Sequence, residues 1–374
     1  MRLVFSAGGS GGHIFPALAV ANEIKRKAPD ANILFIGAKG KMEMERIPKA
    51  GYPIRGLWIS GFLGKSIFSK MATGVKLIHS ILTSYFILRR YRPDVVVGFG
   101  GFASGPALIT ATWMNIPTLI QEQNSYPGLT NRLLGKKVKT ICTAYEEASK
   151  YFQNTQIHLL GNPVRGNLAK AIDRNAALSH FGLANGVNTV LLVGGSLGAK
   201  TFNKTMKALT NEIAKSGIQI IWQIGKLYYE DYSQCDTAQL ENVAALPFLE
   251  RMDLAYSVAD LVVARAGALT ISELALLGKA TLLVPSPNVS EDHQTKNAMA
   301  LVAKNAARII KDNDCEENLI IEVKKILSEK NELEVLKKNI KKLARPNATK
   351  EIAKKVMMLI KGEIQNNKLL KTHQ

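Results

Sequence analysis

Two segments of this chain share one pattern, in which an uninterrupted apolar run ends in a glycine-rich turn and a helical pattern follows. The first is RLVFSAGGSGG, which begins at Arg2, and the second is TVLLVGGSLGA, which begins at Thr189. Continuous apolar runs bounded by glycine are typical of parallel strands that are buried on both faces. The repetition therefore predicts an α/β fold with two Rossmann-like, doubly wound parallel-sheet domains that face each other across a cleft.

Further apolar runs of the same kind fill both halves of the chain and alternate with helical patterns. The expected strands lie at 32–37, 94–100 and 117–123 in the first half, and at 218–225, 241–248, 260–267 and 280–286 in the second. The join between the halves lies near 161–163, where Gly-Asn-Pro follows the run IHLLG. We therefore predict a first domain over 1–162 and a second over 163–344.

Charge and cysteine content narrow the class of protein. The 374 residues include 49 Lys and Arg against 30 Asp and Glu, a net charge of +19, which favours an anionic partner such as nucleic acid, an acidic membrane or a phosphorylated substrate. Cys142, Cys235 and Cys315 are odd in number and far apart, so a disulfide framework or a structural zinc site is not expected. The N-terminal residues lack the pattern of a secretory signal, and the most apolar stretch, 77–88, is about 12 residues where a membrane span needs roughly 20. We expect a protein that is cytoplasmic or touches a membrane without crossing it.

Two glycine-rich turns and one polar segment follow strands of the first half. The turns are 8–12, which leads into His13, and 98–106; the polar segment is 121–124, Gln-Glu-Gln-Asn. Glycine lets a backbone approach a ligand closely, and a helix N-terminus offers unpaired N–H groups to an anion. Because parallel strands end at one edge of a sheet, these segments predict an anion and sugar site there. Such turns also occur simply to pack a helix on a sheet, and that alternative stays open for the glycines.

Nucleotide cofactors with familiar fingerprints are disfavoured. The first turn is not ordered as GxGxxG, and the strand at 32–37 is followed by Ala38 and Lys39 rather than by an acidic residue for an adenosine ribose. No GK[ST] triplet follows a glycine loop, which argues against a P-loop.

The second half carries two further turns of this kind. Residues 194–199, GGSLGA, form another strand-to-helix turn, and 265–273, RAGALTISE, follow an apolar strand and begin a helix. Backbone N–H groups at 268–270 would face a diphosphate, and Glu273 could accept hydrogen bonds from both hydroxyls of a ribose. A glutamate near a helix N-terminus also stabilises the helix dipole, so this simpler role remains open. His293 has no second metal ligand at useful spacing and is expected to be structural.

Basic residues concentrate in one segment. From 46 to 93 there is no acidic residue, and nine Lys and Arg alternate with aromatic and aliphatic side chains. This mixture suits the interface of an anionic membrane, whereas nucleic acid has less use for the aliphatic residues. A helix with one buried face and one solvated basic face is the alternative.

Taken together, the sequence resembles the MurG family of bacterial peptidoglycan glycosyltransferases over nearly its whole length. The resemblance rests on seven ordered motifs: GGSGGHIFPALAVA (8–21), GFGGFASGP (98–106), EQNSYPGLTN (122–131), GNPVR (161–165), GGSLGA (194–199), RAGALTISE (265–273) and DHQTKNA (292–298). It implies the glycosyltransferase B arrangement (GT-B), with a C-terminal helix at 345–374 that crosses back to the first domain. It also implies inverting transfer of N-acetylglucosamine from UDP-N-acetylglucosamine to the 4-hydroxyl of undecaprenyl-pyrophosphoryl-N-acetylmuramyl pentapeptide (lipid I), which gives lipid II.

The resemblance assigns roles to residues of this chain. Ser196 and Arg165 would contact the diphosphate, Leu249 the uracil and Glu273 the ribose. The full set implied to bind UDP-N-acetylglucosamine is Ser10, Gly11, Gly12, Asn124, Arg165, Ser196, Leu249, Ala268, Leu269, Thr270, Ile271, Ser272, Glu273 and Gln294. The acceptor pyrophosphate would meet Gly100, Gly101 and Ser104. The chain departs from the family pattern at Ser10, where threonine is usual, at Leu197, where glutamine is frequent, and at Gln121, where many members have histidine.

Transfer with inversion needs a base for the acceptor hydroxyl and stabilisation of the departing UDP. His13 is the candidate base, since neutral imidazole accepts a proton near pH 7; it could instead bind the acceptor pyrophosphate, and Glu122 is the alternative base. Helix N-termini and Arg165 can stabilise UDP, so no metal or other cofactor is obligatory. The expected partners are the two substrates and, through 46–93, the anionic inner leaflet at the cytoplasmic face of the cell membrane, with the protein peripheral and no nucleic acid bound.

Other functions remain open on the sequence alone. They are a glycolipid glycosyltransferase with another acceptor, a UDP-N-acetylglucosamine 2-epimerase, and a non-catalytic protein that senses a nucleotide sugar or binds nucleic acid.

Overall fold

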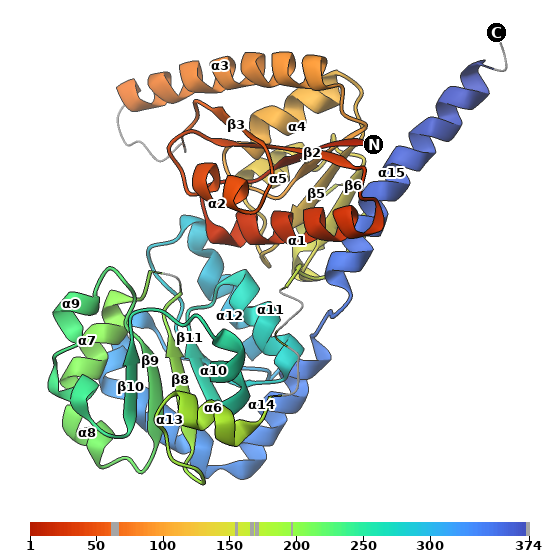
Figure 1. Ribbon diagram of the computed structural model, residues 1–374. Helices are drawn as coiled ribbons and strands as arrows, with labels where there is room; N and C mark the ends of the chain where they lie inside the picture. The colour runs from red at the N-terminus through yellow and green to blue at the C-terminus, as the bar shows by residue number, and fades with distance from the viewer. Residues whose placement is uncertain (61–66, 154–155, 165–167, 169–171, 196, 372–374) are drawn as a thin grey trace. The chain divides into compact units, whose positions relative to one another are not determined.

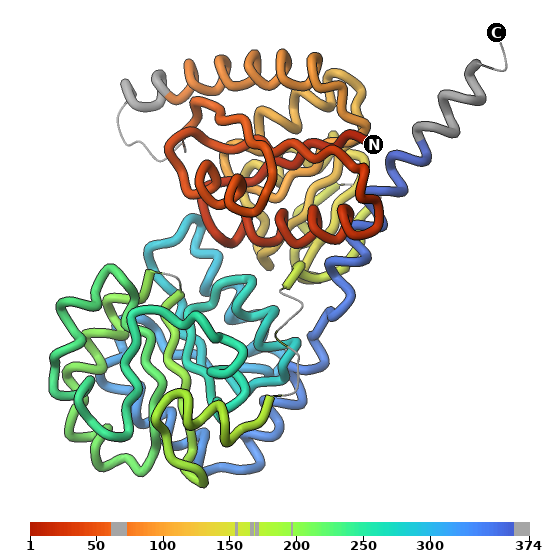
Figure 2. The backbone as a smooth tube through the Cα atoms, in the orientation of Figure 1, coloured from red at the N-terminus to blue at the C-terminus, as the bar shows by residue number. Residues whose placement is uncertain are grey.

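The computed structural model describes residues 1–374 apart from 61–66, 154–155, 165–167, 169–171, 196 and 372–374, and it describes only the backbone of 67–72 and 363–371. The chain divides into two compact units (Figures 1 and 2). Unit 1 comprises Met1–Val164 and Pro346–Gln374, and unit 2 comprises Arg165–Arg345.

Unit 1 is built on a parallel sheet of seven strands in the order β3-β2-β1-β4-β5-β6-β7. The strands are β1 (Arg2–Ser6), β2 (Asn32–Ala38), β3 (Ile54–Leu57), β4 (Val95–Gly98), β5 (Thr118–Glu122), β6 (Thr140–Thr143) and β7 (Ile157–Leu159). The strand order reverses between β1 and β4, and ligands of open α/β sheets bind at the carboxyl ends of such neighbouring strands.

Helices cover both faces of this sheet because its strands are apolar on both sides. They are α1 (Gly11–Lys27), α2 (Glu43–Lys49), α3 (Ile67–Tyr91), α4 (Ser104–Trp113), α5 (Leu129–Leu134) and α15 (Ala348–Lys371), with a 3-10 turn, η1 (Glu147–Tyr151). Alternate residues of β1 point to opposite faces: Leu3 and Phe5 pack in one core with α1 and α15, and Val4 packs in the other with α4. Figure 1 shows α1 on one side of the sheet and α3 and α4 on the other.

The C-terminal helix α15 completes the first of these two cores. Ile352, Ala353 and Val356 are fully buried and share a cluster with Ile14 and Ala17 of α1. Helix α15 is the last in the chain, yet it belongs to the unit that contains the N-terminus.

Unit 2 repeats the architecture with six parallel strands in the order β10-β9-β8-β11-β12-β13. The strands are β8 (Thr189–Val193), β9 (Gln219–Gln223), β10 (Val243–Leu246), β11 (Leu261–Ala264), β12 (Ala280–Leu283) and β13 (Arg308–Ile309). The helices are α6 (Arg174–His180), α7 (Lys200–Ala208), α8 (Thr210–Ala214), α9 (Tyr229–Tyr232), α10 (Met252–Val258), α11 (Ala268–Leu277), α12 (His293–Val302), α13 (Cys315–Ser328) and α14 (Lys330–Lys342). The 3-10 turns are η2 (Asp236–Gln239), η3 (Ser290–Asp292) and η4 (Asp312–Asp314).

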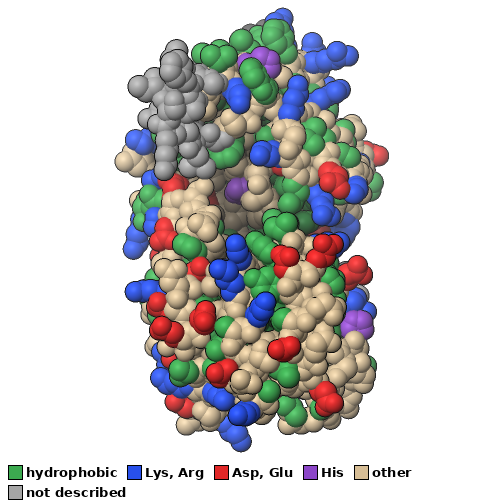
Figure 3. All heavy atoms as spheres, turned by 90° about the vertical axis from the view of Figure 1, so that its left-hand side faces the viewer, with side chains coloured by type: hydrophobic (Ala, Val, Ile, Leu, Met, Phe, Trp, Pro, Cys, Tyr) green, Lys and Arg blue, Asp and Glu red, His purple; other side chains and the backbone are tan. Residues whose placement is uncertain are grey.

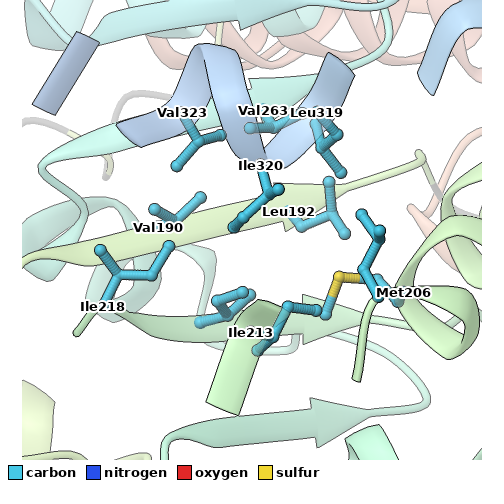
Figure 4. Close-up of a pocket in the computed structure, with 11 residues that line it drawn as sticks. Val190, Leu192, Met206, Ile213, Ile218, Val263, Leu319, Ile320 and Val323 are labelled. Carbon is cyan, nitrogen blue, oxygen red and sulfur yellow. The ribbon is translucent and has the colours of Figure 1, made fainter. Parts of the chain in front are cut away.

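A small cavity of about 20 Å³ lies within the core of unit 2. Figure 4 shows aliphatic side chains from β8, α8 and α13 and the thioether of Met206 around it, among them Val190, Ile213 and Val323. Because its lining is entirely apolar, this space is a packing defect of the core and has no groups that could bind a nucleotide.

The predicted fold class is confirmed, including the helix that returns to the first unit. Strands β3, β6 and β13 were not predicted; β6 and β13 are only four and two residues long. Strand β3 lies at the sheet edge inside the basic segment, and its residues Ile54, Arg55 and Gly56 are only partly covered or exposed. Such a strand lacks the continuous apolar run that marks the central strands.

Candidate active site

The two glycine-rich turns of unit 1 meet at the carboxyl edge of its sheet. Strands β1 and β4 pair in parallel with Ser6 opposite Gly98, so the chain leaves both strands at the same level. A Cβ atom built on Gly101 would lie 2.1 Å from the carbonyl oxygen of Gly8, and Gly101 has φ of +82°. Only glycine fits both constraints, so the contact between the two turns depends on this residue.

His13 lies where these turns touch. It is in the first turn of α1, and its Nδ1 is 2.9 Å from the carbonyl oxygen of Gly8 and 3.2 Å from Oγ of Ser10. Because a carbonyl oxygen only accepts hydrogen bonds, Nδ1 is assigned the hydrogen and Nε2 the lone pair of the neutral ring. A Cβ on Gly100 would lie 2.9 Å from Nε2, so glycine leaves room for the ring there.

A serine within the second glycine-rich turn, 98–106, stabilises the turn by a hydrogen bond to its backbone. Ser104 is fully buried at the start of α4, and its hydroxyl donates a 2.8 Å hydrogen bond to the carbonyl of Gly101. The predicted contact of Gly100, Gly101 and Ser104 with an acceptor pyrophosphate stays a prediction.

Glu122, at the end of β5, has a fully buried carboxylate that organises the following loop. It accepts hydrogen bonds from the backbone N–H groups of Asn124 and Gly128 at 2.9 and 3.3 Å, and from the side-chain amides of Asn124 and Asn131 at 3.3 and 2.8 Å. Burial raises the pKa of this carboxyl, and these hydrogen bonds oppose the rise. The arrangement places Asn124 at the same sheet edge as the glycine turns.

Gln121 occupies the position at which many family members have histidine, and here it has a structural partner. Its Nε2 donates a 3.0 Å hydrogen bond to Oδ1 of Asn162, and Nδ2 of Asn162 donates to the carbonyl of Gln123 at 3.0 Å. These buried amides tie the end of β5 to the segment that leaves unit 1.

In unit 2, the turn after β8 packs on the turn after β9. A Cβ on Gly198 would lie 2.1 Å from the carbonyl oxygen of Ile224, and Gly198 has φ of +81°. Ser196 and Arg165, for which diphosphate contacts are predicted, lie outside the described residues.

Helix α11 begins directly after β11 and carries most of the remaining predicted donor residues. Gly267 is its N-cap with an extended backbone, so the first N–H groups, those of Ala268, Leu269 and Thr270, have no acceptor within the helix. Ile271 and Ala268 are buried, and Ser272 donates from Oγ to the Ala268 carbonyl at 2.9 Å.

Glu273 is held from a neighbouring helix. The hydroxyl of Tyr256, a buried residue of α10, donates a 3.1 Å hydrogen bond to Oε2 of Glu273. Leu249 is buried just after β10, and Oε1 of Gln294 accepts a 2.9 Å hydrogen bond from the backbone N–H of Ser286. The structure thus places Leu249, Glu273 and Gln294 after parallel strands of one sheet, and their contacts with UDP-N-acetylglucosamine stay predictions.

Sequence reasoning missed several residues that support these groups. Arg265 pairs with Asp312 and donates to the carbonyl of Val284 at 3.1 Å, which anchors the segment before α11. Glu43 is fully buried beneath the first glycine turn. A single buried acid or tyrosine within a helix has no distinctive sequence pattern, so Glu43 and Tyr256 could not be singled out.

Two features are absent from the described part of the chain. No three His, Cys, Asp or Glu side chains lie close enough together there to hold a metal ion. Within the same residues, no helix has the length and apolar character needed to cross a membrane.

Comparisons with known proteins agree with this arrangement of two units. Residues 3–143 match the glycosyltransferase family 28 N-terminal domain, and residues 189–355 match the glycosyltransferase family 28 C-terminal domain. A UDP-N-acetylglucosamine–N-acetylmuramyl-(pentapeptide) pyrophosphoryl-undecaprenol N-acetylglucosamine transferase of Flavobacterium psychrophilum is 46% identical over 97% of this chain and 98% of its own length. The transferase of the same name from Bacteroides thetaiotaomicron is 48% identical over 97% and 99%. The chain belongs to the MurG family, within glycosyltransferase family 28.

Solved structures agree with the family assignment. MurG of Acinetobacter baumannii is similar with a TM-score of 0.76 and 28% identity, covering 96% of this chain and all of that one. The UDP-N-acetylglucosamine 2-epimerase of Neisseria meningitidis is similar with a TM-score of 0.67 at 13% identity, covering 96% of this chain and 100% of that one, which shows a shared GT-B fold alone.

Proposed function

We propose that this protein transfers N-acetylglucosamine from UDP-N-acetylglucosamine to the 4-hydroxyl of undecaprenyl-pyrophosphoryl-N-acetylmuramyl pentapeptide, forming lipid II for peptidoglycan synthesis. The observation that carries the proposal is the 46–48% identity, over nearly the full length of both chains, to transferases named for this reaction. The glycine turns and His13 of unit 1 and Glu273 of unit 2 are the groups that we expect to take part in it.

The reaction is an in-line displacement at the anomeric carbon. The acceptor 4-hydroxyl oxygen forms the new bond, the bond from the anomeric carbon to the diphosphate breaks, and UDP leaves with the electron pair. His13 takes the hydroxyl proton on Nε2, because its Nδ1 hydrogen is committed to the Gly8 carbonyl. The N–H groups at the start of α11, together with Arg165 and Ser196, stabilise the departing diphosphate.

His13 is favoured over Glu122 as the base by their hydrogen bonds. The Glu122 carboxylate is 1% exposed and already accepts from two backbone and two side-chain donors. Proton uptake there would replace an acceptor with a donor facing these groups. Glu122 then contributes by holding Asn124 toward the sugar.

The test is transfer of labelled N-acetylglucosamine to a short-chain lipid I analogue, with UDP-N-acetylgalactosamine as the control donor and EDTA as the control for metal dependence. We expect product from the first donor only, unaffected by EDTA. His13→Gln should abolish turnover while UDP still binds, and His180→Gln, at the exposed end of α6, should behave as wild type. Binding without transfer would mean another acceptor or a 2-epimerase, which the appearance of an epimerised UDP-sugar would identify.

We also propose that helix α3 rests on the anionic inner leaflet of the cell membrane, which makes the protein peripheral there. An ordinary surface helix turns its apolar residues toward the core and polar residues outward, but α3 has apolar residues on both sides. Its inward residues include the buried hydroxyls of Ser80 and Ser84 as well as Leu88, which packs in the core of unit 1, whereas Val75, Ile78, Leu82 and Phe86 are 55–65% exposed. An apolar outer face of this kind needs an apolar cover.

Basic residues beside this face select an anionic surface. Arg89 and Arg90 lie at the end of α3, and Nζ of Lys76 lies 5.5 Å from the ring centre of Trp58, which is itself half exposed. Figure 3 shows hydrophobic side chains next to Lys and Arg at the top of the view. Apolar side chains insert at the boundary of the lipid headgroups, and neighbouring Lys and Arg side chains are attracted to anionic lipids.

Vesicle co-sedimentation tests this membrane proposal. Binding to phosphatidylglycerol-containing vesicles should fall at least tenfold in an Ile78→Ser, Phe86→Ser double variant. The matched control, Ile321→Ser with Val335→Ser, removes two exposed apolar residues of unit 2 and should bind as wild type. Equal binding by both double variants would reject α3 as the membrane surface.

A further inference from the structure

We infer that Glu43 is a positioning residue for His13, acting through the single peptide group that joins Gly8 and Gly9. The inference rests on the proposed role of His13 as the base. In this arrangement, a buried carboxylate, one peptide group and the imidazole ring form a continuous chain of hydrogen bonds.

The carboxylate of Glu43 is fully buried, and the donors that bind it in the described part of the chain are backbone N–H groups. Its Oε2 accepts from the Gly9 N–H at 3.1 Å, and its Oε1 accepts from the Ala38 N–H at 2.9 Å. Among the described residues, no Lys, Arg or His forms an ion pair with it. Burying a carboxylate without a cation is costly, so a position that keeps one has a specific use for an acceptor there.

The surrounding glycines leave the space that this carboxylate occupies. A Cβ on Gly8 would lie 2.4 Å from Oε1 of Glu43, and a Cβ on Gly37 would lie 2.5 Å from its Cγ. Glycine at both positions is therefore a steric requirement of Glu43 as well as of the turn.

The same peptide group that Glu43 binds also binds His13. The N–H of Gly9 faces Glu43, and the carbonyl of Gly8 accepts from Nδ1 of His13 at 2.9 Å. No peptide bond between described residues is cis, so this C=O and this N–H point in opposite directions from one rigid plane. Glu43 thereby fixes which end of the peptide faces the imidazole.

This orientation decides which nitrogen of His13 can act. With the carbonyl facing Nδ1, the hydrogen stays on Nδ1 and Nε2 accepts the substrate proton. Gly9 has φ of +84°, and the two glycines offer little resistance to a peptide flip. A flip would turn the Gly9 N–H toward Nδ1 and move the ring hydrogen to Nε2. The Glu43 carboxylate opposes the flip because it accepts hydrogen bonds and donates none. Its charge also polarises the peptide and strengthens the bond to a protonated imidazole.

Glu43→Gln tests the inference, because an amide keeps the size of the side chain but presents an NH₂ group to one of the two backbone N–H groups. We expect kcat to fall about 10- to 100-fold, by analogy with the partners that orient metal-binding histidines. The KM for UDP-N-acetylglucosamine should change less than twofold. Glu45→Gln, on the same helix but exposed and paired with Lys49, is the matched control and should keep wild-type kcat.

Nitrogen-15 NMR of labelled histidine gives a readout that does not depend on activity. The wild-type signals of His13, identified by their loss in His13→Gln, should report the Nδ1–H form in the neutral ring, and Glu43→Gln should shift them toward Nε2–H. Glu43→Asp keeps the charge and should recover part of both kcat and the Nδ1–H signal. If Glu43→Gln does not fold, Glu43→Asp tests the inference by itself, and its His13 signals should report a mixture of the Nδ1–H and Nε2–H forms.

Unchanged His13 signals in the folded Glu43 variants, or a kcat equal to that of Glu45→Gln, would overturn the inference. If the tautomer shifts while His13→Gln remains active, Glu43 still positions the ring and only the role of His13 as the base fails.

Discussion

Tyr256 and Glu273 come from different helices, and the hydroxyl of Tyr256 donates a 3.1 Å hydrogen bond to Oε2 of Glu273. The tyrosine ring is 2% exposed, so α10 holds it rigidly. The carboxylate proposed to bind the ribose is thus oriented by a phenol that is buried in the core of unit 2.

Tyr256→Phe should weaken UDP binding about tenfold, which corresponds to about 1.4 kcal/mol. The ring still fills its site, but Glu273 loses a donor, and a hydrogen bond to a charged group contributes roughly 1.5–3 kcal/mol net of the exchange with water. Isothermal titration calorimetry with UDP measures the change. Tyr232→Phe, in helix α9, should bind UDP as wild type; equal affinities for all three proteins would show that Tyr256 does not orient Glu273.

Gly101→Ala should lower kcat about 100-fold, because the new Cβ would lie 2.1 Å from the Gly8 carbonyl that His13 uses. A displacement of about 1 Å at a reacting group can cost this much. Gly51→Ala is the matched control, since Gly51 has a similar φ of +85° but no atom within 4 Å of the added Cβ. Steady-state assays of both variants separate the clash from the backbone strain, and equal kcat values would contradict the prediction.

Lys279→Met should stabilise unit 2 at pH 7 by about 1–2 kcal/mol. Burial lowers the pKa of Lys279 from 10.5 to about 8, so the folded protein holds this proton less tightly than the unfolded chain. Wild-type stability therefore rises with pH between about 8 and 10.5, and the advantage of the variant should shrink over that interval.

Urea unfolding at several pH values measures this trend. Trp222 is fully buried in unit 2, and replacing Trp58 and Trp113 with phenylalanine leaves it as the fluorescent probe. Lys338→Met changes an exposed lysine of α14 and should show no such pH trend. A constant difference between Lys279→Met and wild type from pH 7 to 10 would argue against the lowered pKa.

Val190→Ile should stabilise unit 2 by roughly 0.5–1 kcal/mol, because one added methyl group enters the apolar cavity of about 20 Å³. The same fluorescence assay reports the free energy of unfolding. Val335→Ile, at an exposed position of α14, should leave that free energy unchanged. A destabilised Val190→Ile would mean that the cavity cannot admit the methyl group without displacing β8.

Most of the fold could be predicted from the sequence because its central strands are buried on both faces. Runs such as 2–6 and 189–193 are apolar throughout, and each ends in a glycine turn that only a few conformations allow. Strand β3 could not be predicted in this way, since an edge strand with an exposed arginine carries no such run.

The candidate site was predictable only where its residues belong to a motif. His13 and Glu273 stand at fixed positions after strands, and the resemblance names them. Glu43 and Tyr256 act on these residues from elsewhere in the chain, Glu43 at a separation of 34 positions from Gly9 and Tyr256 at 17 from Glu273. Those contacts depend on how helices pack, which local sequence patterns do not encode.

The placement of α15 has a consequence for biosynthesis. A ribosome makes the chain from its N-terminus, and domains synthesised first usually fold first. Here Ile14 and Ala17 of α1 keep an apolar face uncovered until Ile352 and Val356 have been translated. We therefore expect unit 2 to reach its native state while unit 1 is still incomplete. The N-terminal segment is translated first, but its apolar face on α1 is buried last, when α15 docks.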